Sequence, residues 1–177
     1  QVIEMTYNGV DEDRRYITRS AEELPQYLSS DVLLWRMTGI NIPLCPGNVL
    51  LALRKLPIEP DYNEEASFST VKDLIEKRRI AWEKKVNREI PMRVNQWREL
   101  VEDYKRNAVI DASYHYNVRV RIILHLLLKE SRYLDQEMLK KIEGADELLR
   151  LLGKPGECVW DPDLIPVFPR ELHPYLY

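Results

Sequence analysis

Residues 70–107 read TVKDLIEKRRIAWEKKVNREIPMRVNQWRELVEDYKRN and carry the strongest periodic pattern in the chain. In the first half, apolar side chains recur at the spacing of one helix face, and basic side chains occupy the opposite face. From Ile90 onward, apolar residues recur at alternating steps of four and three, which keeps one seam turned toward a neighbouring helix. Thr70 is a suitable N-cap, and Pro91 predicts a kink or a break. The stretch therefore predicts a long, amphipathic, Pro-kinked helix.

A second helix is predicted over residues 112–131, although YHYNVRVRI (114–122) alternates like a strand. Continued through Lys129, this pattern would exceed the usual strand length, and its second half is rich in leucine rather than in β-branched residues. We therefore predict a mostly buried helix. Further helical pieces follow over residues 135–143 and 146–152, and Gly153 is a natural stop.

The first 65 residues predict smaller elements. Residues 2–20 contain two short runs rich in β-branched and aromatic residues around Asn8-Gly9, which favours a small N-terminal β-hairpin. Pro25 would interrupt a helix that begins before it, so a short helix starting at Pro25 is expected. A buried strand or short helix is expected over residues 31–37. A helix with Pro46 at its start is expected to follow.

The tail, residues 154–177, differs in kind from the rest. Five prolines disfavour regular structure, yet the segment is too apolar for a disordered linker. We predict an irregular, Pro-rich C-terminal strap laid over the helices, with Trp160, Phe168 and Tyr175 as anchors. A partner-docking peptide is the alternative, because proline-rich segments with aromatic anchors also serve that purpose.

Length and composition fit one domain, residues 1–177, and the helical patterns predict a mainly α fold. Three sections follow from the patterns: the acidic section 1–65 with the hairpin and short elements, a helical core over 66–153, and the tail. The formal net charge is −3, but residues 66–141 are net basic and both ends are net acidic. Either the acidic ends cover the basic centre, or a basic face is open to an anionic partner.

Several function classes are disfavoured by what the sequence lacks. The motifs GxGxxG, GxxxxGK[ST], HExxH and GxSxG are absent, so we expect no cofactor and no metal site. No apolar run approaches the ~20 residues that span a bilayer, so no membrane association is expected. Cys45 and Cys158 do not form a CxxC pattern, which predicts a reduced, cytoplasmic location. Cys45 precedes a helix start, where a thiolate can be stabilised, but no acid or base partner is evident in the sequence.

One weak enzymatic pattern is present. Arg119 is followed six residues later by His125, a spacing similar to that of helical ribonucleases of the HEPN type, in which an arginine and a histidine from a dimer form a composite site. The position after the arginine, usually polar in that family, is Val120 here. The resemblance implies catalytic roles for Arg119 and His125. A single histidine among leucines, however, indicates a core residue.

The long amphipathic helices and the lack of a catalytic pattern favour a non-catalytic protein that binds another protein or itself. An alternative is a nucleic-acid-binding protein that neutralises phosphates with the basic face of the 70–107 helix. The isoelectric point of about 5.7 counts against this alternative. The candidate partner-binding residues are Lys77, Arg78, Lys84, Lys85, Arg88 and Trp97.

Overall fold

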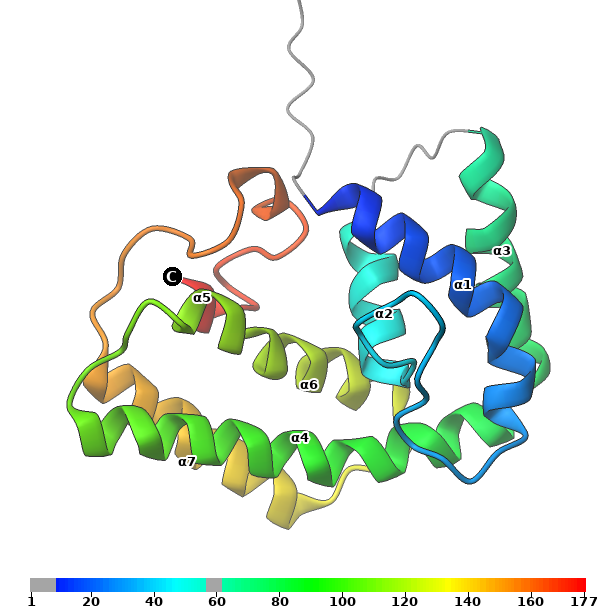
Figure 1. Cartoon of the computed structure of the whole chain (residues 1–177). Helices are drawn as coiled ribbons and strands as arrows, with labels where there is room; N and C mark the ends of the chain where they lie inside the picture. The colour runs from blue at the N-terminus through cyan, green and yellow to red at the C-terminus, as the bar shows by residue number, and fades with distance from the viewer. Residues whose placement is uncertain (1–8, 57–61) are drawn as a thin grey trace, which may run out of the picture. The chain divides into compact units, whose positions relative to one another are not determined.

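The computed structural model describes residues 9–56 and 62–177 (Figure 1). Within these ranges the regular structure is helical, and the one isolated β-bridge joins Trp35 to Leu44. The predicted mainly α fold class is therefore confirmed. The elements are α1 (Val10–Leu28), α2 (Pro46–Lys55), α3 (Tyr62–Lys77), α4 (Arg79–Asn107), α5 (Tyr114–Asn117), α6 (Arg119–Glu130), α7 (Gln136–Leu152) and the short 3-10 turns Pro162–Leu164 and Pro174–Leu176.

The described chain divides into two compact units. We refer to residues 9–89 as the N-unit and to Ile90–Tyr177 as the C-unit. The N-unit contains α1, α2, α3 and the first part of α4, and the C-unit contains the rest of α4 with α5, α6, α7 and the tail. The prediction of a single domain concerns cooperative folding and stays a prediction.

The predicted N-terminal hairpin is wrong where the structure describes it. Its second arm lies inside α1, and its first arm, residues 1–8, lies outside the described residues. The local β propensity of Tyr16-Ile17-Thr18 is overridden because the buried residues of α1 recur at helical spacing, and the acidic first turn suits the helix dipole. Pro25 also lies inside α1 rather than at a helix start. Burial of Leu24 and Tyr27 on either side of it offsets the missing hydrogen bond.

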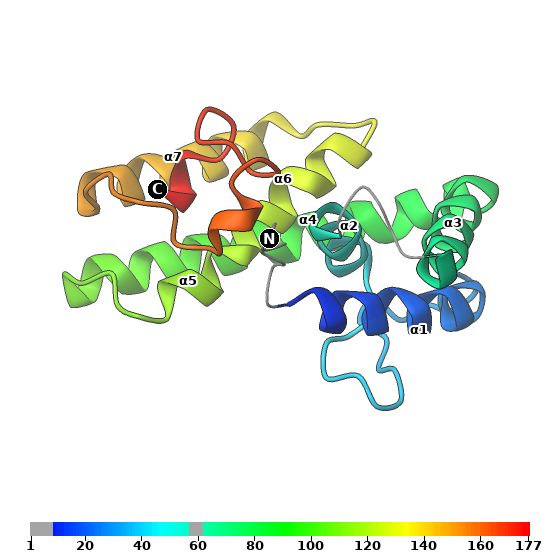
Figure 2. The same ribbon diagram turned by 90° about the horizontal axis from the view of Figure 1, so that it is seen from above.

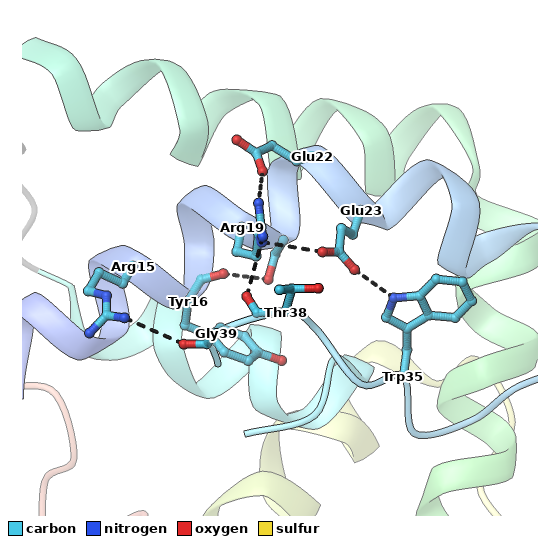
Figure 3. Close-up of polar contacts among 9 residues, drawn as sticks. Arg15, Tyr16, Arg19, Glu22, Glu23, Trp35, Thr38 and Gly39 are labelled. Atoms are coloured by element: carbon cyan, nitrogen blue, oxygen red, sulfur yellow. Dashed lines mark hydrogen bonds and ion pairs between the residues drawn. The ribbon is translucent and has the colours of Figure 1, made fainter. Parts of the chain in front are cut away.

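In the N-unit, α1 packs against α2 and α3, and the loop after α1 returns along it. The carbonyls of Thr38 and Gly39 accept hydrogen bonds from Arg19 and Arg15, at 3.3 and 3.5 Å (Figure 3). Trp35 donates its indole N–H to Glu23 at 2.7 Å. The predicted strand or short helix over residues 31–37 is a loop in the structure, and these side-chain contacts fix its course.

The start of α2 is held by a buried acid from α4. Pro46 begins the helix as predicted, and Glu89, which is fully buried, accepts a hydrogen bond from the backbone N–H of Gly47 at 2.8 Å. The thiol of Cys45 lies 3.3 Å from the other carboxylate oxygen. A carboxylate at this position satisfies a backbone donor that the first helical turn leaves unpaired. Glu89 thus fixes α2 on α4.

The predicted long helix is interrupted at Arg78 rather than at Pro91. The helix α3 begins at Tyr62, so Thr70 is not an N-cap but an interior residue whose hydroxyl donates to the carbonyl of Ala66 at 2.7 Å. The two helices α3 and α4 leave the Arg78 junction in different directions, as Figures 1 and 2 both show. Pro91 lies inside α4, which continues through it. The chain therefore changes direction at Arg78, one helical turn before Trp82.

The predicted seam of α4 forms one wall of the C-unit core. The buried members of this seam are Ile90, Val94, Trp97, Val101 and Tyr104. Its last position, Ala108, is exposed and follows the end of α4 with a positive φ of 52°. The single helix predicted over residues 112–131 is two helices, α5 and α6, which are separated at Val118. The predicted burial holds for α6, where Ile122, Leu124 and Leu127 are fully buried, but α5 has no buried residue. The two helical pieces predicted around Gly144 form one helix, α7, and Gly153 follows its end.

The tail is an irregular strap, as predicted. Phe168 is 1% exposed and Leu176 is fully buried, whereas the predicted anchor Trp160 is half-buried and donates its indole N–H to the carbonyl of His115 at 2.7 Å. The ring of His173 lies 4.6 Å from that of His125 in α6. Figure 1 shows the tail, coloured orange to red, beside α5. The tail thus completes the C-unit core.

Candidate partner-binding site

An open cavity of about 730 Å³ lies in the N-unit. It is located where the end of α1 approaches the junction of α3 and α4, an arrangement of helices that can be followed in Figure 1. Its walls come from residues 28–31 and from positions between 76 and 88. Five of the six candidate partner-binding residues predicted from the sequence line this cavity, together with Arg79. These five are Lys77, Arg78, Lys84, Lys85 and Arg88.

Lys85 is the anchor of this cavity. It is only 4% exposed, and its ammonium group donates to the carbonyl oxygens of Ser30, at 2.7 Å, and of Val32. The same ammonium lies 4.3 Å from the centre of the Tyr27 ring. Burial lowers the pKa of Lys85, and the nearby charge of Arg88 lowers it further. The role of Lys85 is therefore to tie the loop after α1 to α4, rather than to project into solvent.

Three arginines of the cavity are partly engaged. Arg78 donates to the hydroxyl of Ser29 at 3.2 Å, and Arg88 donates to the carbonyl of Asp31 at 2.8 Å. Arg79 pairs with Glu83 at 3.0 Å. Because a guanidinium group carries five N–H donors in a planar fork, these contacts leave further donors on Arg78 and Arg88 for a ligand. The contacts also restrict the motion of the two side chains.

Lys77 and Lys84 differ from the other cavity cations. Both side chains are exposed, and no residue in the described part of the chain forms a hydrogen bond or an ion pair with either ammonium group. The acidic residues in the lining are Asp31 and Glu76, against six basic residues. The cavity therefore carries an excess of positive charge, and its two unpaired ammonium groups are accessible to an anionic ligand.

Trp97, the sixth candidate, lies in the C-unit and not on the cavity. Its side chain is fully buried, and its indole N–H donates to Asp146 at 2.8 Å. Arg121 in α6 holds the same carboxylate through both oxygens, with the shortest distance 2.9 Å. Trp97 thus belongs to a partly buried network that joins α4, α6 and α7.

The structure does not bring Arg119 and His125 together within one chain. Six residues along a helix correspond to a rise of ~9 Å and a rotation of ~240°, so the two side chains leave α6 on different sides. Arg119 lies over the Tyr116 ring at 5.4 Å, whereas His125 faces His173 of the tail. The ribonuclease interpretation gains no geometric support and stays a prediction.

Two features of the structure were missed from the sequence. The acid partner of Cys45 is Glu89, but both side chains are fully buried, so the pair serves the start of α2. The contribution of residues 28–31 to the cavity was missed as well. The signal in the sequence was Lys85, a lysine among apolar positions at the margin of a helix face, which indicates a cation with a buried partner.

Other site types find little support in the structure. Within residues 9–56 and 62–177, no group of three or more His, Cys, Asp or Glu side chains is arranged to hold a metal ion. Among the same residues, no helix has the length and apolarity needed to cross a membrane. A smaller cavity of about 370 Å³ lies between α1 and residues 38–40, but its Arg19 is engaged by Glu22, Glu23 and the carbonyl of Thr38. The basic cavity is therefore the strongest candidate site.

Comparison with known proteins adds no relative: no family model, no curated protein and no solved structure matches the chain.

Proposed function

We propose that the protein is a non-catalytic binding protein whose basic cavity holds an acidic segment of a protein partner. The observation that carries this proposal is the gathering of six basic side chains around one cavity, two of them with unpaired ammonium groups. Carboxylates of a partner segment would replace water around Lys77 and Lys84 and form charge-assisted hydrogen bonds with them.

The rest of the lining supports binding by making the site preorganised. Lys85 and Arg88 fasten residues 30–32 to α4 through backbone carbonyls, so this wall is in place before a ligand arrives. Arg78 holds Ser29 through the side-chain hydroxyl of that residue. A preformed wall lowers the entropic cost of binding, because fewer side chains and loop residues are ordered on association.

A protein segment fits the lining better than a nucleic acid does. Proteins that bind single strands stack bases on aromatic side chains, and no aromatic side chain is among the described residues that line the cavity. The net charge of −3 also opposes the approach of a long polyanion, since the field of the whole chain acts at distances beyond the cavity. A short acidic segment experiences mainly the local excess of positive charge.

Reversing the charge of the two unpaired lysines is expected to weaken this binding. The probe is a short fluorescein-labelled peptide rich in glutamate with interspersed leucines, and fluorescence anisotropy gives its Kd for the full chain. Lys77→Glu/Lys84→Glu should raise the Kd by roughly tenfold or more, because two attractions become repulsions at the cavity rim. The wild-type affinity should also fall as the salt concentration rises.

The matched control is Lys105→Glu/Lys140→Glu. It changes the net charge equally, at two exposed lysines of the C-unit that do not line the cavity. This variant should bind the peptide like the wild-type chain. Equal Kd values for the two double variants would refute the proposal. Tighter binding of a single-stranded or duplex oligonucleotide than of the peptide would favour the nucleic-acid alternative instead.

A further inference from the structure

Ile80 is the exposed apolar side chain in the lining of the basic cavity. It lies in the first turn of α4 and is 76% exposed, between the lining residues Arg79 and Ala81. The opposite side of this helix packs into the core of the N-unit through Trp82 and Val86, which are both fully buried. Ile80 is rotated by ~200° from Trp82 at 100° per residue, so it points away from that core.

Local structure gives no reason for an isoleucine at this position. Its β-branched side chain loses rotamer freedom in a helix, and an exposed position returns no burial in exchange. A single exposed apolar residue is ordinary on a protein surface. Ile80 differs from Val109 or Leu151, which are also exposed, because it shares a cavity with the unpaired ammonium groups of Lys77 and Lys84.

We infer that Ile80 is the apolar contact of the cavity, and that the partner segment therefore carries an aliphatic side chain among its acidic residues. This inference rests on the proposed function. An aliphatic side chain placed on Ile80 would remove apolar surface from water on both molecules. It would also exclude water from the adjacent ion pairs, which strengthens them because the local dielectric constant falls.

The chemistry of the lining separates this ligand from other anions. A phosphate or a purely acidic peptide would pair with the cations but would leave Ile80 in water, so its affinity would not depend on that residue. The affinity of an acidic segment with an aliphatic side chain would depend on both the cations and Ile80. A binding affinity that depends on Ile80 therefore identifies the inferred class of partner.

The experiment compares two fluorescein-labelled peptides of equal charge, one rich in glutamate with interspersed leucines and one with each leucine replaced by glutamine. The full chain is used as wild type and as Ile80→Gln and Ile80→Leu. The wild-type chain should bind the leucine peptide roughly fivefold to tenfold more tightly than the glutamine peptide. Ile80→Gln should abolish this preference without weakening binding of the glutamine peptide, and Ile80→Leu should keep it.

The control variant is Val109→Gln, which replaces an exposed valine of the C-unit outside the cavity and should leave the preference unchanged. Thermal melting of Ile80→Gln should match that of the wild-type chain, since the side chain is largely exposed. The inference is overturned if the wild-type chain shows no preference for leucine, or if Ile80→Gln retains it. If reversal of Lys77 and Lys84 still weakens binding in that case, the proposed function stands and only the inference fails.

Discussion

Removal of residues 154–177 should lower the free energy of unfolding of the C-unit by several kcal/mol or cause the chain to aggregate. The tail contributes five residues to the core that are less than a tenth exposed, namely Leu164, Phe168, His173, Tyr175 and Leu176. Truncating one large buried aromatic residue typically costs ~3–5 kcal/mol. Loss of all five would expose apolar surface of the C-unit core to water, which is a recognised cause of aggregation.

Specific polar contacts also tie the tail to the helices. The hydroxyl of Tyr114 in α5 donates to the backbone carbonyl of Tyr175, and the guanidinium of Arg121 in α6 lies 4.5 Å from the centre of the Tyr175 ring. His173 shares a hydrogen bond of 2.7 Å with the hydroxyl of Tyr175. Because these contacts run to two separate helices, the tail is expected to unfold together with them.

Two measurements test the role of the tail. Limited proteolysis should leave residues 154–177 uncut under native conditions, and a chain ending at Gly153 should melt at a lower temperature or scatter light as aggregates. Phe168→Ala is the milder variant if the shortened chain cannot be purified, and it should lower stability by ~3–5 kcal/mol. A shortened chain that melts like the intact one would identify the tail as a docking peptide, the alternative that its proline content allows.

Asp146→Ala should be the most damaging single substitution of a polar residue in the C-unit. The carboxylate accepts hydrogen bonds from Arg121 through both oxygens and from the indole N–H of Trp97. The side chain of Arg121 is 12% exposed, so removal of its partner leaves a largely buried charge unpaired. Because Asp146 itself is 30% exposed and water can partly replace it, we expect a loss of about 2–4 kcal/mol.

Urea denaturation followed by tryptophan fluorescence measures this loss. The control is Glu147→Ala at the next position, whose exposed carboxylate pairs with Arg150 on the surface of α7 and should matter little. Asp146→Asn should fall between the two, since its amide oxygen still accepts one hydrogen bond. An unfolding midpoint for Asp146→Ala equal to that of Glu147→Ala would show that the network does not stabilise the C-unit.

The sequence predicts the helices well where burial is periodic. Val71, Trp82, Val94 and Val101 follow a helical period and are all buried in α3 and α4. The prediction fails at prolines and at turns. Pro25 and Pro91 both lie inside helices, because the packing of neighbouring apolar residues outweighs one missing hydrogen bond. The change of direction at Arg78 could not be predicted, because no glycine or proline lies near it in the sequence.

The candidate site is only half predictable from the sequence. The basic side chains belong to one periodic segment, so their common face can be derived from helical spacing. The opposite wall cannot be derived from helical spacing. Lys85 and Ser30 are separated by 55 positions along the chain, and only the fold brings them together. The polar partner of Trp97 was missed for the same reason, since Asp146 lies 49 positions away along the chain. Local patterns carry no information on such pairs.

The most direct test of the basic cavity as a binding site is an NMR titration of the isotopically labelled full chain with the glutamate and leucine peptide. We expect the largest amide shift changes at residues 28–31 and at positions between 76 and 88, which line the cavity. At the same peptide concentration, Lys77→Glu/Lys84→Glu should strongly reduce these changes while leaving the spectrum of the C-unit intact. Shift changes confined to the C-unit, or unaltered by this double variant, would contradict the assignment of the cavity as the site.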